Sequence, residues 1–282
     1  GADANDTAIK LARSRTGRRE ILAFSGGYFG RAGGVIGLNG KSAIRTRVGV
    51  DPDAQFLPFP DPYRWPDELG GQAGAGDAAL RLVRDTLEDP GSGTGPLAAI
   101  VVEPIQGNGG IVRPPDGFLE GLRTLADAHG ITLIFDEIQS GFGRSGRMWA
   151  AEHAGVVPDL LTVGKGIGGG MALSAVLGRA QAMSHWPAGT HTSTFLGNAV
   201  NLAAGRAAIR VMCRDRLWER SAQLGERLLA RLTEALGDHP GVGEIRGRGL
   251  FIGIELVRDR ATKEPDPESA AAVRDMLRGG VP

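Results

Sequence analysis

The sequence predicts an α/β protein in which a mostly parallel sheet is flanked by helices, followed by part of a small α+β domain. Two observations carry this prediction. Short apolar runs alternate with amphipathic helical patterns through most of the chain, an order that is typical of βαβ units. The runs are continuous rather than alternating in polarity, as expected for strands that are buried on both faces of a parallel sheet.

The elements follow from these patterns in chain order. The apolar runs predict strands over residues 21–24, 97–102, 131–135, 160–163 and 172–177. The amphipathic patterns predict helices over residues 4–15, 78–87 and 117–129, and a long helix from about residue 198 to residue 236. After that helix, the segment EIRGRGLFIGIEL predicts two short strands around a glycine-rich turn. We therefore expect a large α/β domain over residues 1–210 and the start of a small α+β domain over residues 211–282.

Length, charge and cysteine content limit the class of protein. A chain of 282 residues with 41% hydrophobic residues can bury a sizeable core. Its 32 basic and 32 acidic residues give a net charge of zero, so no general field attracts nucleic acid or an acidic membrane surface. No apolar run reaches the roughly 18 residues that span a bilayer. The single cysteine, Cys213, which we expect to pack inside its helix, fits a reducing compartment and hence a soluble, cytoplasmic protein.

Three chemically active side chains follow predicted strands. They are Glu103 after AAIVV, Asp136 after ITLIF and Lys165 after DLLTVG. Because ligands of an open parallel sheet bind beyond the carboxyl ends of its strands, we expect these side chains at one site. A strand-end aspartate can also be a helix cap or a loop anchor, but a partly buried one favours a cationic partner. The glycines around Lys165 would let a bulky planar group reach its amine, which suits a Schiff-base nucleophile or a proton shuttle.

The glycine loop TVGKGIGGG also has to be compared with two nucleotide-binding motifs. The P-loop pattern does not fit, because Asp159 occupies its first glycine position and Gly166 follows the lysine. The dinucleotide pattern fits Gly164, Gly166 and Gly169, but it requires an acidic residue about 20 positions later. No Asp or Glu occurs from residue 160 to residue 214, which argues against a nicotinamide dehydrogenase and would suit an anion such as a phosphate.

Four longer motifs occur in a fixed order along the chain. They are EPIQGNGGIVRPPDGFLEGLR, LIFDEIQSGFGRSG, PDLLTVGKGIGGGMALSAVLG and HTSTFLGN. Together they resemble the class III aminotransferases, which are pyridoxal-phosphate (PLP) enzymes of fold type I. The resemblance covers nearly the whole chain and implies a homodimer with shared active sites. Because the chain starts inside the family's GADAND motif and ends before its carboxylate-binding arginine, we expect a fragment that lacks both ends.

The resemblance implies the catalytic residues and the residues around the cofactor ring. Lys165 resembles the lysine that forms the Schiff base with PLP. Asp136 resembles the carboxylate that pairs with the pyridine nitrogen, so that the ring can act as an electron sink. Ile138 is expected to pack on one face of the ring, and Tyr28 to stack on the other. Gln139 is expected to hydrogen-bond the 3-oxygen of the ring.

Other residues are implied at the phosphate and beside the ring. Gly1 and Ala2 resemble the loop whose backbone amides hold the phosphate at a helix N-terminus. Thr194, in the HTSTF segment, resembles the threonine that reaches the phosphate of the partner subunit's cofactor. Glu103 is expected to orient neighbouring polar groups of the site. The five histidines show no metal-ligand spacing, so no metal is expected.

The implied activity is transfer of an amino group from an amino acid or amine donor to a 2-oxo acid through a Lys165 Schiff base. Asn108 stands where the ornithine and 4-aminobutyrate members carry a gating glutamate. This difference leaves open a decarboxylating transaminase of the dialkylglycine type, an aminomutase or an epimerase. A catalytically inert PLP-fold protein is the alternative of another class. Arg246 and Arg248 fit equally well as site residues of the small domain or as structural arginines of a turn.

Overall fold

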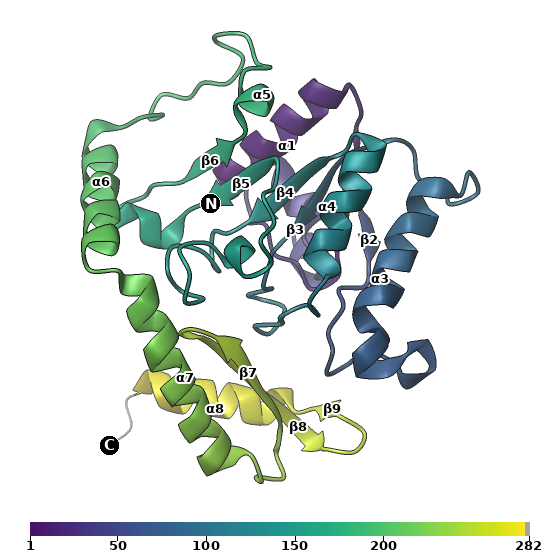
Figure 1. The fold of residues 1–282 in the computed structure, drawn as a ribbon, viewed down its shortest axis with the longest axis vertical. Coiled ribbons are helices and arrows are strands. Elements are labelled where there is room, and N and C mark those ends of the chain that lie inside the picture. Colours follow the sequence, from purple (N-terminus) through teal and green to yellow (C-terminus); the bar gives the residue numbers. More distant parts are fainter. Residues whose placement is uncertain (280–282) are drawn as a thin grey trace.

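The structure, a computed structural model, describes residues 1–279 of the chain. At its centre lies a six-stranded sheet in the order β2-β1-β3-β4-β5-β6 (Figure 1). Strands β1 to β5 pair in parallel, and β6 pairs antiparallel with β5, which confirms the mostly parallel sheet. The strands are β1 (Glu20–Phe24), β2 (Gln55–Leu57), β3 (Leu97–Val102), β4 (Thr132–Asp136), β5 (Leu160–Val163) and β6 (Ala175–Gly178).

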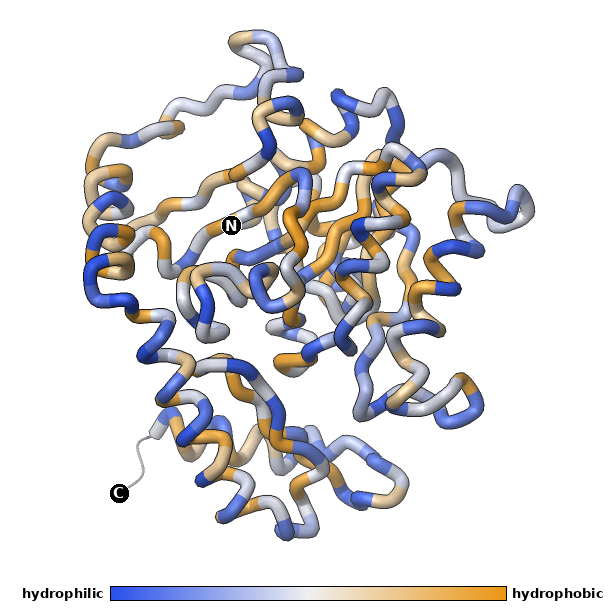
Figure 2. The backbone as a smooth tube through the Cα atoms, viewed as in Figure 1, coloured by the Kyte–Doolittle hydropathy of each residue, from blue (hydrophilic) through white to orange (hydrophobic). Residues whose placement is uncertain are grey.

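Helices cover both faces of this sheet. On one face lie α1 (Ala2–Thr16) and the short α5 (Ala180–Met183), and on the other lie α3 (Gly71–Glu88) and α4 (Phe118–His129) (Figure 1). Hydrophobic segments gather at the sheet, whereas hydrophilic stretches lie in the outer loops and on the outer sides of the helices (Figure 2). Removal of these apolar surfaces from water is the main force that holds the three layers together.

Alternate residues of each strand face opposite helical layers. In β4, Phe135 belongs to the core cluster with α3 and α4, whereas Ile134 packs in the cluster with α1. Because successive side chains alternate across a strand, Asp136, the last residue of β4, points to the α1 face. In β3, Val101 packs with α1, so Glu103, two residues later, lies on the α1 face as well. Both carboxylates therefore lie on the α1 face, where Asp136 contacts Asn5 of α1.

The C-terminal part leaves the sheet through two helices, α6 (Ala199–Arg214) and α7 (Leu217–Leu236). It ends in a three-stranded antiparallel sheet followed by α8 (Pro267–Gly279) (Figure 1). The strands of this sheet are β7 (Val242–Arg248), β8 (Phe251–Asp259) and β9 (Glu264–Pro265). Strands β7 and β8 confirm the two strands expected around a glycine-rich turn. The division into domains 1–210 and 211–282 stays a prediction, and its boundary falls inside α6.

The prediction of one long helix from residue 198 to residue 236 is wrong. The chain is interrupted between α6 and α7, where Arg216 has a left-handed φ of 46° that an α-helix does not accommodate. Helix α3 begins at Gly71 rather than residue 78. Small residues in its first turns allow a close approach, because a Cβ on Gly76 would lie only 3.2 Å from Pro115 Cβ. Cys213 is exposed rather than packed.

The edges of the sheet also differ from the predicted strands. The three-residue edge strand β2 has no predicted counterpart, because it is too short to give an apolar run. The strand predicted over residues 172–177 begins only at Ala175 and is partly exposed at the opposite edge. The remaining elements are short: α2 (Ser42–Thr46) and 3₁₀ turns over Gly33–Leu38, Asp67–Leu69, Ala150–His153 and Lys165–Gly168. Among residues 1–279, no helix combines the length and the apolar character needed to cross a membrane.

Candidate active site

The carboxyl ends of β1, β3, β4 and β5 open onto a pocket of about 240 Å³. Every predicted site residue except Thr194 lines it. The lining residues are Gly1, Ala2, Asn5, Tyr28, Phe29, Gly30, Arg31, Glu103, Asp136, Ile138, Gln139 and Lys165. Thr194 lies in an exposed segment outside this pocket, so its predicted role at a partner subunit's cofactor stays a prediction.

Asp136 is a buried carboxylate whose hydrogen-bond partners are all neutral. Only 4% of its surface is exposed. Its Oδ2 accepts a hydrogen bond from Asn5 Nδ2 at 2.7 Å, and its Oδ1 accepts one from the Ile138 backbone N–H at 2.9 Å. Burial raises the pKa of this carboxyl above its ordinary value, and the two hydrogen bonds and the charge of Lys165 only partly offset that rise. The site therefore holds an acceptor that a cation would stabilise.

Asn5 is a positioning residue that the sequence analysis did not identify. Its Nδ2 donates to Asp136 and to the Phe29 carbonyl at 3.0 Å, while its Oδ1 accepts from the Thr162 hydroxyl at 2.7 Å. The amide thus ties α1 to the ends of β4 and β5. A signal was present in the sequence, since Asn5 falls on the same helix face as the buried Ala8 and would otherwise be an unpaired polar group in the core.

Lys165 begins a 3₁₀ turn directly after β5 and has a left-handed φ of 46°. Such a conformation is strained for a residue other than glycine and often occurs at functional sites. Its Nζ donates to Gln139 Oε1 at 3.2 Å. Burial lowers the pKa of the Lys165 ammonium, and the nearby carboxylates of Asp136 and Glu103 partly offset that shift.

The glycine before Lys165 allows close packing at the edge of the pocket. A Cβ on Gly164 would lie 3.3 Å from Ile138 Cγ2, and a Cβ on Gly1 would lie 3.1 Å from the same atom. Ile138 therefore packs between the start of α1 and the lysine loop. Gln139 is confined in the same way, because a Cβ on Gly107 would lie 2.5 Å from its Oε1.

Glu103 anchors two backbone segments beside the pocket. It is 5% exposed, and its carboxylate oxygens accept hydrogen bonds from the Tyr28 N–H at 2.9 Å and the Gly107 N–H at 3.0 Å. Burial and the charge of Asp136 raise the pKa of Glu103. The carboxylate thus holds the segment that carries Tyr28 at the pocket.

Glu137 is a third buried carboxylate, and it does not line the pocket. Its Oε2 accepts from the Ser140 hydroxyl and its Oε1 from the Ala151 N–H, each at 2.7 Å. Burial raises its pKa to about 7. Because Glu137 follows Asp136 in an extended segment, it points away from α1 and fastens the loop after β4 instead.

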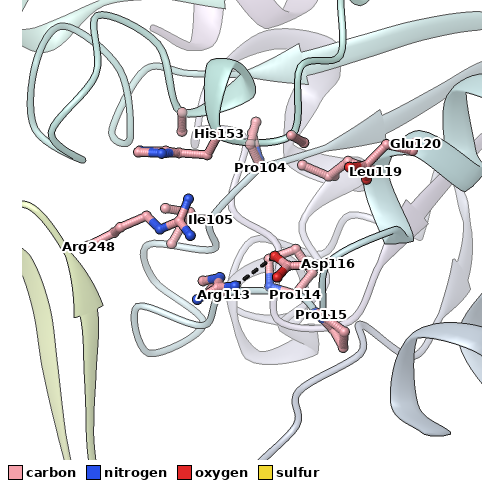
Figure 3. A pocket seen from close by; sticks show the side chains of 12 residues that line it. Pro104, Ile105, Arg113, Pro114, Pro115, Asp116, Leu119, Glu120, His153 and Arg248 are labelled. Carbon is pink, nitrogen blue, oxygen red and sulfur yellow. Dashed lines mark hydrogen bonds and ion pairs between the residues drawn. The ribbon is translucent and has the colours of Figure 1, made fainter. Parts of the chain in front are cut away.

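A smaller cavity of about 30 Å³ lies where β7 meets the segment after β3 (Figure 3). It has room for about two water molecules. Arg248 and His153 line it, together with Arg113, which pairs with Asp116 at 2.6 Å. Neither Arg246 nor Arg248 lines the 240 Å³ pocket.

Comparison with known proteins assigns the chain to a family. The profile described as "Aminotransferase class-III" matches residues 1–281. The chain belongs to the class III aminotransferases. It is 42% identical, over 97% of its length, to a diaminobutyrate–2-oxoglutarate aminotransferase of Haemophilus influenzae, and covers 62% of that protein. It is 38% identical to a leucine/methionine racemase of Thermococcus litoralis over 97% of its length, covering 61% of that protein.

A solved structure gives the same assignment. The PLP-bound amine transaminase from an uncultivated Pseudomonas species superposes with a TM-score of 0.89 at 31% identity, over 99% of this chain and 66% of that one. This similarity confirms the predicted fold type I. The chain spans about three fifths of the length of the curated relatives described above.

Class III aminotransferases are PLP-dependent, and the pocket residues fit this cofactor. Asp136 is a buried carboxylate with neutral partners, and a protonated pyridine nitrogen would give it the cation that it lacks. Lys165 supplies an amine at the same pocket, and Tyr28 and Ile138 offer an aromatic and an aliphatic surface. The first backbone N–H groups of α1 have no partner within the helix and face an anion favourably. They belong to Ala2 and its successors, and Ala2 lines the pocket.

We expect Asn5→Leu to weaken both the fold and the cofactor site. The substitution keeps the size of the side chain but leaves Asp136 Oδ2 and the Thr162 hydroxyl without their partner, which costs about 1–3 kcal/mol for a buried group. Urea unfolding measures the loss of stability, and a fluorescence titration with PLP measures the loss of affinity. Lys10→Leu, at an exposed position of the same helix, is the control. Equal effects of the two substitutions would contradict the role of Asn5.

The raised pKa of Glu137 predicts a contribution to stability that is lost as the pH rises from about 4.5 to about 7. A folded-state pKa of about 7, above the ordinary value of 4.5, means that the folded protein binds more protons than the unfolded chain in this range. Glu103 contributes in the same direction. The half-buried His153, whose pKa is lowered to about 4, contributes in the opposite direction, mainly between about pH 4 and 6.5.

Glu137→Gln isolates this contribution, because glutamine resembles the protonated acid. We expect the variant to gain stability relative to the unchanged protein as the pH rises, with a difference in slope of up to about 1.4 kcal/mol per pH unit. Urea unfolding at several pH values without added PLP measures it. Parallel curves for the two proteins between about pH 4.5 and 7 would show that the pKa of Glu137 is not raised.

Proposed function

We propose that the protein is a PLP-dependent aminotransferase that moves an amino group from an amino acid or amine donor to a 2-oxo acid. The observation that carries this proposal is Asp136, a buried carboxylate with neutral partners in the same pocket as Lys165. A carboxylate that only caps a helix or anchors a loop would not require an amine and an open pocket beside it. Membership of the class III family supports the same function.

The pocket residues would hold and orient the cofactor. The Asp136 carboxylate would pair with the ring nitrogen and keep it protonated, and Ile138 and Tyr28 would contact the two faces of the ring. Gln139 would hydrogen-bond the 3-oxygen, and the backbone amides at Gly1 and Ala2 would bind the phosphate. Glu103 positions the Tyr28 backbone through its hydrogen bond at 2.9 Å. When bound, PLP supplies an electron sink for the electron pair left on the donor carbon.

Lys165 moves the proton. Its Nζ must be neutral to act as a base, and partial burial, which lowers the pKa of the ammonium, favours that form. The neutral Nζ would take the proton from the donor Cα, hold it, and release it to a carbon of the cofactor. Gln139, whose Oε1 accepts from Nζ, holds the amine at the pocket between these events. The reverse sequence with a 2-oxo acid completes the transfer.

We further propose a homodimer in a cytoplasmic location. Thr194 is followed by exposed apolar residues, since Phe195 is 80% and Leu196 56% exposed. An exposed apolar segment is a common sign of an interface, and Thr194 would then reach the phosphate of the partner subunit's cofactor. The cytoplasmic location rests on the single cysteine, which indicates a reducing compartment.

Borohydride reduction of the PLP-loaded protein tests the site. We expect a pyridoxyl adduct at Lys165 and nowhere else. The chain has only four lysines (Lys10, Lys41, Lys165 and Lys263), so mass mapping of the peptides assigns the adduct without ambiguity. Lys165→Ala should give no adduct and no turnover, whereas the control Lys10→Ala, at an exposed position of α1, should keep both. An adduct spread over the exposed lysines would contradict the proposed site, and an adduct without turnover on any donor would favour an inert protein.

Racemisation or epimerisation of an amino acid is the second candidate function. The similarity to the leucine/methionine racemase favours it over other reactions of the same cofactor, and Asn108 in place of the gating glutamate leaves it open. Such a reaction needs Lys165 Nζ to remove and return a proton at the same carbon, with no acceptor acid.

Incubation of the PLP-loaded protein with single enantiomers of aliphatic amino acids, with and without 2-oxoglutarate, separates the two functions. An aminotransferase should consume the amino acid continuously only when the 2-oxo acid is present, and chiral chromatography should detect no opposite enantiomer accumulating. A racemase should form the opposite enantiomer over many turnovers without any 2-oxo acid. The Lys165→Ala variant serves as the blank in both assays.

A further inference from the structure

The hairpin β7–β8 packs on the segment after β3, and Arg246 supplies side-chain hydrogen bonds at this contact. Arg246 Nε and Nη2 both donate to the Gly110 carbonyl, at 2.9 and 2.7 Å. The same guanidinium pairs with Glu244 at 2.7 Å and with Glu255 at 2.5 Å, and its side chain is only 11% exposed. Glu244 and Glu255 thus fix the orientation of the Arg246 guanidinium, which donates two hydrogen bonds to the Gly110 carbonyl.

Gly110 belongs to a tight and strained loop, residues 107–111. Gln106 and Val112 pair at its base, and Ile111 has a left-handed φ of 56°. A β-branched residue adopts this conformation only when its surroundings impose it. Arg246 contacts the carbonyl directly before this residue, and a Cβ on Gly253 of β8 would lie 2.9 Å from the same oxygen. The hairpin therefore supports the strained end of the loop, together with the loop's own hydrogen bonds from the Gly110 and Ile111 N–H groups to the Gly107 carbonyl.

The other end of the loop lies at the pocket. The Gly107 N–H donates to Glu103 Oε1 at 3.0 Å, and a Cβ on Gly107 would lie 2.5 Å from Gln139 Oε1. The Ile111 N–H donates back to the Gly107 carbonyl at 3.1 Å, so the two ends are linked within the loop. A continuous set of contacts leads from Arg246 through this loop to two residues that line the pocket.

We propose that Arg246 is a positioning residue of the active site, through which the β7–β8 hairpin holds the 107–111 loop in the conformation that places Glu103 and Gln139. The role in catalysis rests on the proposed function, whereas the mechanical coupling does not. Arg248, two residues later on β7, lines the small cavity with Ile105 instead (Figure 3). Of the two arginines of this motif, Arg246 alone contacts the 107–111 loop among the residues described.

Hydrogen exchange of the loop tests the coupling without any cofactor. We expect Arg246→Met to speed exchange of the Gly107 and Ile111 amides by about tenfold or more, as loss of a charge-assisted buried hydrogen bond predicts. Arg64→Met is the matched control. Arg64 pairs with the same Glu255 and donates to the Lys263 carbonyl at 3.0 Å, but it does not contact the loop, so exchange there should stay within about twofold.

The PLP-loaded protein supplies a second readout. We expect the pH midpoint of the visible absorbance of bound PLP to shift in Arg246→Met and not in Arg64→Met, because only the first displaces Glu103 and Gln139. If Arg246→Met does not fold, the same two measurements are made on Arg246→Lys. This variant keeps the charge between Glu244 and Glu255 but cannot make both hydrogen bonds to the Gly110 carbonyl, so the same direction of change is expected. Unchanged loop exchange, or equal changes in the Arg64 control, would overturn the proposal. Absence of a PLP absorbance band in the unchanged protein would count against the proposed function alone, since the exchange result stands without it.

Discussion

The burial of the Asp136 carboxylate is the constraint on which the site depends. Removal of an ionised carboxylate from water is costly unless donors or a cation replace the solvent. Here Asn5 and the Ile138 N–H supply two donors, and both are themselves held by the fold, Asn5 through α1 and Ile138 through the loop after β4. These donors offset only part of the desolvation cost, so the pKa of Asp136 stays raised. A cationic ring nitrogen would stabilise the ionised carboxylate and lower this pKa.

The sheet decides which side chains can meet at this carboxylate. Parallel strands end at one edge, so residues far apart in the sequence, such as Glu103, Asp136 and Lys165, are brought together by strand order alone. The alternation of side chains along each strand then selects the face. This is why Asp136 meets α1 while Glu137, the next residue, fastens the loop behind it. Neighbours in sequence therefore serve different purposes with the same functional group.

Much of the sheet could be predicted from the sequence, because continuous apolar runs are local signals, and the polar residues after these runs indicated Glu103, Asp136 and Lys165. The other predicted pocket residues, namely Gly1, Ala2, Tyr28, Ile138 and Gln139, were implied only by the resemblance to the family. Asn5 was missed because its importance comes from Thr162 and Asp136, which only the tertiary fold places beside it. Helix α3 begins earlier than predicted because close packing at Gly76 outweighs the low helix propensity of glycine. The break at Arg216 has no glycine or proline to mark it, so propensity gave no warning there.

The buried carboxylates Glu103, Asp136 and Glu137 are expected to respond differently to a bound cation, because their surroundings differ. Asp136 lines the pocket and would gain the cation directly. Glu103 lines it too, but both of its oxygens are already occupied by the backbone N–H groups of Tyr28 and Gly107. Protonation of Glu103 would weaken these two hydrogen bonds, and one of them belongs to the 107–111 loop. Glu137 faces away from the pocket, and the main cause of its raised pKa is its own burial. A cation in the pocket would thus act most directly on Asp136, the carboxylate whose partners are two neutral donors.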